Sequence, residues 1–192
     1  LKGGHSGLEI NLGRANANKL MARFVRQAIA DDDARLCSWN GGDMRNAIPS
    51  VATAVLTIPQ ENLDDLKDLL NYCRETFARE YEGIEAGIEM TLESTTMPDG
   101  QVPLEIQDNL VDAIMACHDG VLRHIPSIPD VVETSSNLAS VRMNSEAKTI
   151  DINSSQRSSI LSARINMANT FAAAFELAGA KVEIGEGYPG WK

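Results

Sequence analysis

The sequence contains few of the residues on which disulfide frameworks and aromatic binding surfaces depend. Its 192 residues include three cysteines, and aromatic residues make up only 5 % of the chain. The cysteines, Cys37, Cys73 and Cys117, are odd in number and widely spaced without a pattern. A disulfide framework needs paired cysteines, so this usage fits a reduced cytosolic setting better than a disulfide framework.

Basic residues are also scarce relative to acidic ones. Lys and Arg number 17 against 27 Asp and Glu, giving a formal net charge of −10. Nucleic acids and anionic membranes attract basic surfaces, so we expect neither as a partner. No apolar run approaches the roughly 20 residues that cross a bilayer, and no signal-peptide pattern is present. The composition therefore predicts a cytoplasmic protein.

Metal-ligand and nucleophile motifs are missing as well. Cys117, His118 and His124 lie close together, but no second ligand pair follows at a zinc-site spacing. The acidic residues between 61 and 68 lie on the solvated side of an expected helix. No Ser-His-Asp set, nucleophile elbow or phosphate-binding loop occurs. The sequence thus predicts no metal site in this chain and argues against a hydrolase that acts alone.

Hydrophobic spacing gives a regular order of elements in the first half. Residues recurring at three and four positions predict helices over 15–30 and 63–81. Alternating or β-branched runs predict strands over 34–39, 51–58 and 84–92. With an extended segment at the start of the chain, this half has the order β-α-β-β-α-β.

The second half repeats much of this pattern. The expected elements are a helix over 104–118, strands at 138–143 and 150–152 joined by a turn at 144–146, a helix from about 159, and a strand at 182–184. The predicted fold class is α+β: an antiparallel sheet with helices packed on one face, in sub-halves of about 1–93 and 104–187. We expect another copy or another domain to cover the free face of the sheet.

Two segments have an unusual choice of residues. Residues 3–7 read Gly-Gly-His-Ser-Gly, and glycines on both sides of His5 permit a close approach of the main chain. His5 is therefore either a functional side chain or a loop histidine without a role. Arg157 ends a strand just before a helix, where its planar fork suits a carboxylate. The alternative for Arg157 is an ordinary surface ion pair.

Five strings, taken in order, resemble the aminoacyl-histidine dipeptidases (Xaa-His dipeptidases) of the di-zinc exopeptidase superfamily. They are Leu-Lys-Gly-Gly-His-Ser-Gly with Asn-Ala-Asn-Lys-Leu at 16–20, Asn-Gly-Gly-Asp-Met-Arg-Asn-Ala-Ile-Pro at 40–49, Val-Glu-Thr-Ser-Ser-Asn at 132–137, Arg-Ser-Ser at 157–159 and Gly-Tyr-Pro-Gly-Trp at 187–191. The resemblance covers essentially the whole chain and is weakest over 82–130. It implies the lid or dimerisation domain that is inserted into the catalytic domain of such enzymes.

The resemblance also implies roles for three residues. His5 matches the family histidine that stabilises the oxyanion formed on the scissile carbonyl. Arg157 matches the arginine that holds the terminal carboxylate of the substrate. Asn46, in Asn-Ala-Ile-Pro, matches a weaker candidate for substrate contact. The arginine comes a whole repeat after Asn46, an arrangement that indicates the subgroup with an enlarged lid.

The resulting expectation is that residues 1–192 are a lid or dimerisation domain excised from a larger metallopeptidase. That enzyme would bind two zinc ions, hydrolyse Xaa-His dipeptides and form a homodimer. Its zinc ligands and catalytic Glu would lie outside this chain, so the chain alone would bind no zinc and be inactive. The start without Met and the turn-like end favour this reading. The alternative is a stand-alone, non-catalytic α+β module that self-associates through its sheet, with no metal-ligand motifs encoded beyond residues 1 and 192.

Overall fold

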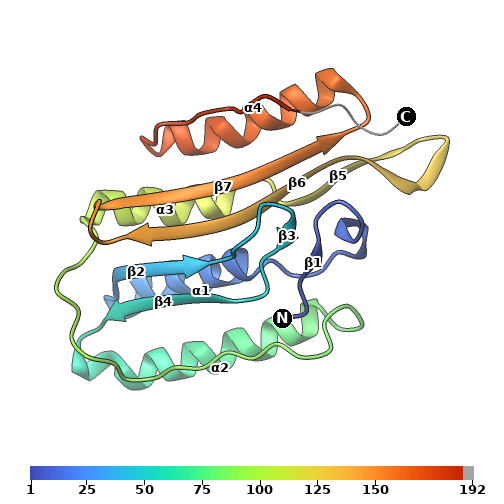
Figure 1. Ribbon diagram of the computed structural model, residues 1–192. Coiled ribbons are helices and arrows are strands. Elements are labelled where there is room, and N and C mark those ends of the chain that lie inside the picture. Colours follow the sequence, from blue (N-terminus) through green and yellow to red (C-terminus); the bar gives the residue numbers. More distant parts are fainter. Residues whose placement is uncertain (188–192) are drawn as a thin grey trace.

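The computed structural model describes residues 1–187, which form a five-stranded sheet, a two-stranded ribbon and four α-helices (Figure 1). The elements are β1 (Gly4–His5), η1 (Ile10–Leu12), α1 (Ala17–Asp32), β2 (Arg35–Gly41), β3 (Ala47–Ile48), β4 (Ala52–Thr57), η2 (Gln60–Asn62), α2 (Leu63–Glu80), α3 (Leu104–Ala116), β5 (Gly120–Ile125), β6 (Ile128–Asn144), β7 (Thr149–Ser158) and α4 (Leu161–Leu177). No helix among these is long and apolar enough to span a membrane.

Strand β6 is the centre of the sheet. It is 17 residues long. Its first part pairs with β5, its last part pairs with the end of β2, and β7 pairs along its other edge. Strand β4 completes the order β4-β2-β6-β5, and every pairing is antiparallel. The predicted α+β class with an antiparallel sheet is confirmed.

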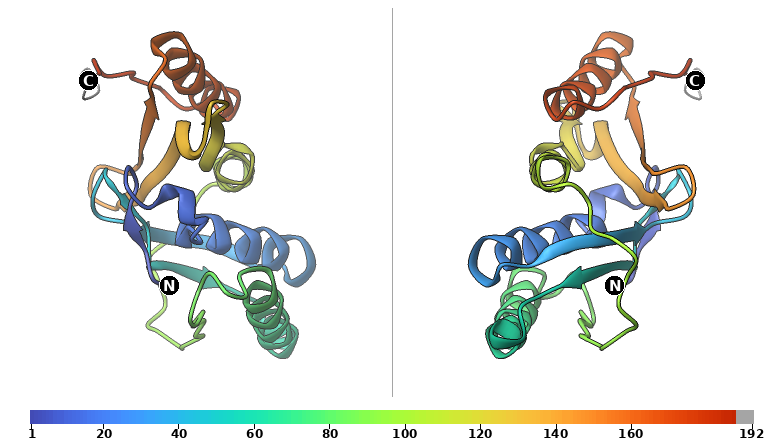
Figure 2. Two further views of the ribbon diagram at one scale, coloured as in Figure 1. Left: turned by 90° about the vertical axis from the view of Figure 1, so that its right-hand side faces the viewer. Right: turned by 90° about the vertical axis from the view of Figure 1, so that its left-hand side faces the viewer.

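The helices cover one face of this sheet, and the β1–β3 ribbon lies on the other side (Figure 2). The core lies between sheet and helices. Trp39 of β2 and Leu138 of β6 are fully buried there against Phe77 of α2 and Ile114 of α3. In α2, Leu66, Leu70, Cys73 and Phe77 recur at three and four residues and form its buried stripe. This is the periodicity from which the sequence predicted the helix.

A buried asparagine ties the start of α1 to β6. Asn16 caps the helix, because its Oδ1 accepts a hydrogen bond from Asn18 N at 3.0 Å. Its Nδ2 donates to Leu138 O at 2.9 Å and to Asp119 Oδ1 at 3.0 Å. Asp119 Oδ1 also accepts from Leu138 N at 2.7 Å. Burial raises the pKa of the Asp119 carboxyl, so these bonds compensate a carboxyl group that has been taken out of water.

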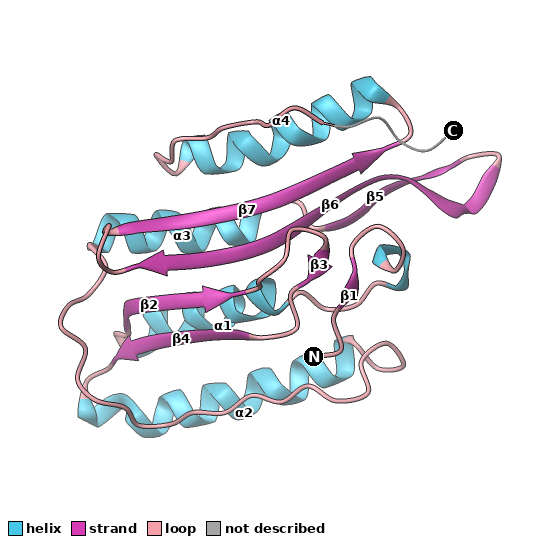
Figure 3. Ribbon diagram, viewed as in Figure 1, coloured by secondary structure: helices cyan, strands magenta, loops and turns pink. Residues whose placement is uncertain are grey.

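Two predicted strands are wrong. Residues 84–103 contain no strand within the described chain and run as a loop alongside α2 (Figures 1 and 3). Their alternation has another cause, since Ile88 and Met90 pack against the core from this loop. Residues 182–184 also form no strand, although Val182 contacts the core. An alternating pattern reports one-sided burial, which a loop lying on the core satisfies as well as a strand does.

The second half also contains a strand that the sequence did not predict. Strand β5 follows the expected 104–118 helix, which ends two residues early, at Ala116. The hairpin of β6 and β7 turns at 145–148, close to the predicted turn, but β6 begins ten residues before the expected start at 138. The order of this half is therefore α-β-β-β-α, and the partial repeat of the first half is only approximate.

We expect Asn16→Ala to lower the free energy of unfolding by about 2–4 kcal/mol, because it removes a helix cap and leaves Asp119 with one fewer buried donor. Urea unfolding followed by circular dichroism measures this loss. Asn71→Ala, on the exposed side of α2, is the matched control and should change the value by less than about 0.5 kcal/mol. Equal effects of the two substitutions would contradict the assigned role of Asn16.

Candidate functional site

His5 lies on the short ribbon that covers the sheet face opposite the helices. Strands β1 and β3 pair antiparallel, with His5 opposite Ala47 and Gly4 opposite Ile48. The ribbon is attached to the central strand, because Asn137 Nδ2 of β6 donates to Ala47 O at 2.8 Å. After His5 the chain turns back, and both Leu8 N and Glu9 N donate to His5 O. His5 is therefore held at a fixed place over β6.

The imidazole of His5 is oriented by its own loop. Its Nδ1 accepts hydrogen bonds from Gly7 N at 3.0 Å and from Leu8 N at 3.1 Å. An atom that accepts two N–H donors carries no proton, so the proton of the neutral ring is on Nε2. The loop thus presents Nε2–H as a hydrogen-bond donor.

Arg157 lies next to this histidine, although 151 residues separate them in the sequence. It stands near the end of β7, opposite Ser135 of β6. A Cβ atom built on Gly7 would be 3.0 Å from both Cζ and Nη1 of Arg157 and 3.1 Å from Cε1 of His5. The guanidinium and the imidazole therefore both lie against Gly7, at the place that a side chain on this residue would occupy. The structure brings together the two residues that the sequence singled out.

The Arg157 side chain has no hydrogen-bond or ion-pair partner within residues 1–187, and its Nε is buried without an acceptor. This is unexpected in a chain with 27 acidic and 17 basic residues. A buried N–H group without an acceptor costs roughly 1–3 kcal/mol, more where the group is charged. The surface ion pair considered from the sequence is not formed, and the guanidinium is open to an external acceptor.

Asn46 contacts the His5 loop through its main chain. It lies in the turn before β3, is exposed, and its carbonyl accepts a hydrogen bond from Ser6 N at 2.8 Å. The next residue, Ala47, pairs with His5. The bond to Ser6 joins the turn to the Gly-Gly-His-Ser-Gly segment. A contact between the Asn46 side chain and a substrate stays a prediction.

A glutamate far along the chain closes the His5 loop. Glu85 accepts hydrogen bonds from Lys2 N at 2.9 Å and from Ala15 N at 3.1 Å, one on each side of the loop. Glu85 lies within 84–92, where the sequence predicted a strand and the structure has a loop. The segment after α2 therefore supports the loop that carries His5, a role that the sequence did not reveal.

Sequence reasoning also missed Asn137. This residue is 2 % exposed, and its Oδ1 is buried without a hydrogen-bond partner. It lies opposite Ser155 on β7, and Ser155 Oγ donates to Arg45 O at 3.1 Å. The available signal was the run of small polar residues from Thr134 to Asn137, which is unusual in a buried strand. It entered the sequence argument only as part of the family resemblance.

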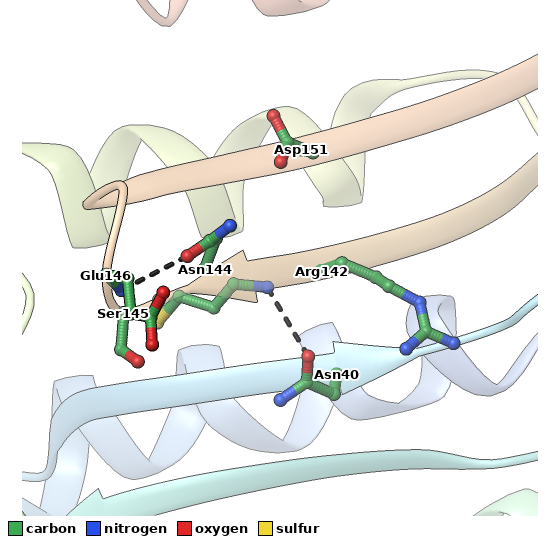
Figure 4. Close-up of a pocket in the computed structure, with 7 residues that line it drawn as sticks. Asn40, Arg142, Asn144, Ser145, Glu146 and Asp151 are labelled. Atoms are coloured by element: carbon green, nitrogen blue, oxygen red, sulfur yellow. Dashed lines mark hydrogen bonds between the residues drawn. The ribbon is translucent and has the colours of Figure 1, made fainter.

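An open cavity of about 390 Å³ lies at the other end of β6 and β7, by their hairpin (Figure 4). Its lining includes Asn40, Arg142 and Asp151. Two of these side chains are engaged: Arg142 donates to Gly42 O and pairs with Asp43, and Asn40 Oδ1 accepts from Met143 N. The cavity is separate from the His5–Arg157 pair, because neither residue lines it.

The described residues contain no group of three or more His, Cys, Asp or Glu that could hold a metal ion. Within residues 1–187 the chain therefore supplies no such set of ligands. The Gly-Tyr-Pro-Gly-Trp string at 187–191 falls almost entirely on residues 188–192, outside the described part.

Comparison with known proteins gives three matches. Residues 1–85 match the family model described as "Peptidase dimerisation domain". The chain is 35 % identical over 192 residues to the cytosol non-specific dipeptidase of Escherichia coli (strain K12), covering 100 % of the chain and 39 % of that protein. It matches the crystal structure of aminoacylhistidine dipeptidase from Vibrio alginolyticus with a TM-score of 0.93 and 38 % identity, covering 100 % of the chain and 39 % of that structure.

The resemblance to the aminoacyl-histidine dipeptidases, and to a peptidase dimerisation domain in particular, is thereby confirmed. The chain spans 39 % of the length of the two dipeptidases that it matches.

We expect Gly4→Ala to distort the His5 loop and to lower the free energy of unfolding by roughly 1–3 kcal/mol, because its φ of +151° is strained for an L residue. The added Cβ would also be 2.4 Å from Arg14 Nη1. Gly87→Ala is the matched control, since a Cβ there meets nothing within 4 Å. Urea unfolding measures both variants, and a Gly4→Ala protein as stable as the parent would show that the loop is not held as described.

Proposed function

We propose that this chain is the lid or dimerisation domain of a cytoplasmic dipeptidase that hydrolyses Xaa-His dipeptides, and that it supplies His5 and Arg157 to the active site. The observation that carries the proposal is the Arg157 guanidinium, which has no partner within residues 1–187 and lies beside the His5 imidazole at Gly7. Both matched relatives are dipeptidases. A non-catalytic, self-associating module would leave the open guanidinium without a purpose.

Arg157 is suited to hold the free carboxylate at the end of a dipeptide. A guanidinium forms two parallel N–H···O bonds to a carboxylate, which fix both its position and its orientation. Because a dipeptide has only one peptide bond, fixing its carboxylate also places the scissile carbonyl. The preference for short substrates with a free carboxyl end follows from this contact.

His5 is suited to donate a hydrogen bond to the oxygen of that carbonyl. The two bonds at Nδ1 keep the ring in the form that carries its proton on Nε2. A donor fixed in advance stabilises the negative charge that develops on the oxygen in the transition state, with no cost of reorganisation. Asn46, on the neighbouring turn, is the third candidate for a substrate contact.

The remaining parts of the site would lie outside this chain. Because residues 1–187 hold no metal-ligand group, the two zinc ions and the catalytic Glu that we propose for the full enzyme belong to its catalytic domain. The chain alone would then be inactive. Its partners would be that catalytic domain, a second copy of the enzyme and the dipeptide.

The face of β6 and β7 that carries Arg157 is polar. Arg142 and Asp151 face each other across the two strands, as do Ser140 and Asn153 and also Asn137 and Ser155. Over β6 this face is already covered by the β1–β3 ribbon, to which Asn137 is hydrogen-bonded. Its exposed part, at Asp151 and Asn153 of β7, suits a hydrated polar contact with a catalytic domain that opens and closes over the substrate.

We expect His5→Ala to lower kcat for an Xaa-His dipeptide by about 10²–10³-fold in the intact enzyme, since it removes a transition-state donor. KM and the zinc content should stay close to those of the parent. Steady-state kinetics and metal analysis measure these quantities, with His124→Ala on exposed β5 as the histidine control. Unchanged turnover in the His5 variant would remove His5 from the mechanism.

We expect Arg157→Ala to raise KM by about 10-fold or more for dipeptides with a free carboxylate, because a charge-assisted bond of about 1.5–3 kcal/mol is lost. The loss should be much smaller for the same dipeptides with an amidated carboxyl end. Arg26→Ala, which breaks the exposed Arg26–Asp112 pair, is the control. Equal losses on free and amidated substrates would refute the carboxylate contact.

A further inference from the structure

The main chain on both sides of Gly4 is held by one ion pair. Glu9 Oε2 accepts a hydrogen bond from His5 N at 2.8 Å, and Glu9 Oε1 pairs with Arg14 Nη2 at 2.9 Å. Arg14 Nη1 in turn donates to Gly3 O. The Glu9–Arg14 pair therefore bonds the carbonyl before Gly4 and the N–H after it. No other carboxylate among the described residues contacts the His5 main chain.

This pair is packed tightly against the loop. The Arg14 side chain is only 9 % exposed. A Cβ on Gly4 would be 2.4 Å from Arg14 Nη1 and 2.8 Å from Glu9 Oε2, so the pair occupies the space that a side chain would need. The bond from His5 N–H, together with the charge of Arg14, lowers the pKa of Glu9 and keeps it ionised at neutral pH.

The ring of His5 depends on this arrangement. Its Nδ1 bonds to Gly7 N and Leu8 N form only when the chain turns back directly after His5. Glu9 is itself part of that turn, because its N–H donates to His5 O at 2.9 Å. Glu9 thus fixes the peptide before His5 with its carboxylate and the turn after His5 with its main chain. These two constraints decide where Nε2–H lies.

We propose that Glu9 and Arg14 are positioning residues for His5: they hold its imidazole in the Nε2–H form beside Arg157 and touch no substrate themselves. The expected effect on kcat rests on the proposed function, whereas the expected effect on the tautomer of the His5 ring does not. Loss of the pair releases the turn, and the ring then exchanges between its two neutral forms.

The first test is the tautomer of His5, read from the ¹⁵N shifts of its ring nitrogens in the intact natural polypeptide that carries residues 1–192. The parent should show one protonated nitrogen, Nε2, and one acceptor, Nδ1. Glu9→Ala, which removes both bonds of the carboxylate, should move the two shifts towards a common average. Glu9→Gln, which keeps an acceptor but loses the charge that binds Arg14, should give an intermediate result.

Glu80→Gln is the matched control, because it breaks a similar glutamate–arginine pair, Arg23–Glu80, between α1 and α2 and away from the loop. It should leave the His5 shifts unchanged. If Glu9→Ala does not fold, Glu9→Gln supports or overturns the proposal by the same measurement. Parent-like His5 shifts in the folded Glu9 variants would overturn it.

The second test is the kinetics of the same variants on an Xaa-His dipeptide. Glu9→Ala should lower kcat by between about 10-fold and 10²-fold, with KM nearly unchanged, because a misplaced donor weakens the transition state alone. A fall in kcat with parent-like ring shifts would overturn the positioning role. A polypeptide that hydrolyses no dipeptide would overturn the proposed function, and the ring shifts would still decide the proposal for Glu9 and Arg14.

Discussion

The structure depends on the central strand β6, which is paired on both edges and buried on both faces. From Glu133 to Val141 every residue is at most 6 % exposed. One face packs on the helices through Leu138 and Val141, and the other carries Asn137, which holds β3 by hydrogen bonds. A strand enclosed on four sides cannot shift its register without losing all these contacts together. The site has two parts, the ribbon with His5 and strand β7 with Arg157. Both are bonded to β6, so this one rigid strand fixes their relative position.

The contacts around β6 also explain why the Arg157 guanidinium forms no ion pair within residues 1–187, although the chain is acidic. Arg157 is held by the pairing of β7 with β6, and the two carboxylates bonded to the His5 loop already have partners: Glu9 binds Arg14 and His5, and Glu85 binds two main-chain N–H groups. Glu133, on the neighbouring strand segment, is bound by Arg123. The carboxylates around the site thus have their own donors, and the guanidinium is left for a carboxylate that arrives from outside.

Much of the fold could be predicted from the sequence, because hydrophobic residues recur at three and four positions in a helix that packs on a core. The buried stripe of α2 could be predicted from local spacing alone, and it consists of Leu66, Leu70, Cys73 and Phe77. Alternation was less reliable, since Ile88 and Met90 alternate in a loop and not in a strand. Strand β5 escaped prediction because its exposed residues, such as Arg123 and His124, lack an apolar pattern. What the sequence patterns report is burial, and burial has more than one structural cause.

The site was predictable only in part, for a different reason. The types of residue at His5 and Arg157 suggested chemistry, but only the family resemblance connected two positions that local patterns could not join. Proximity in space arises here from three successive pairings, β1 with β3, β3 with β6 through Asn137, and β6 with β7. No local rule encodes such a chain of contacts. Gly7 is the clearest case: in the sequence it is one glycine of a glycine-rich loop, and in the structure the imidazole and the guanidinium both lie where its side chain would be.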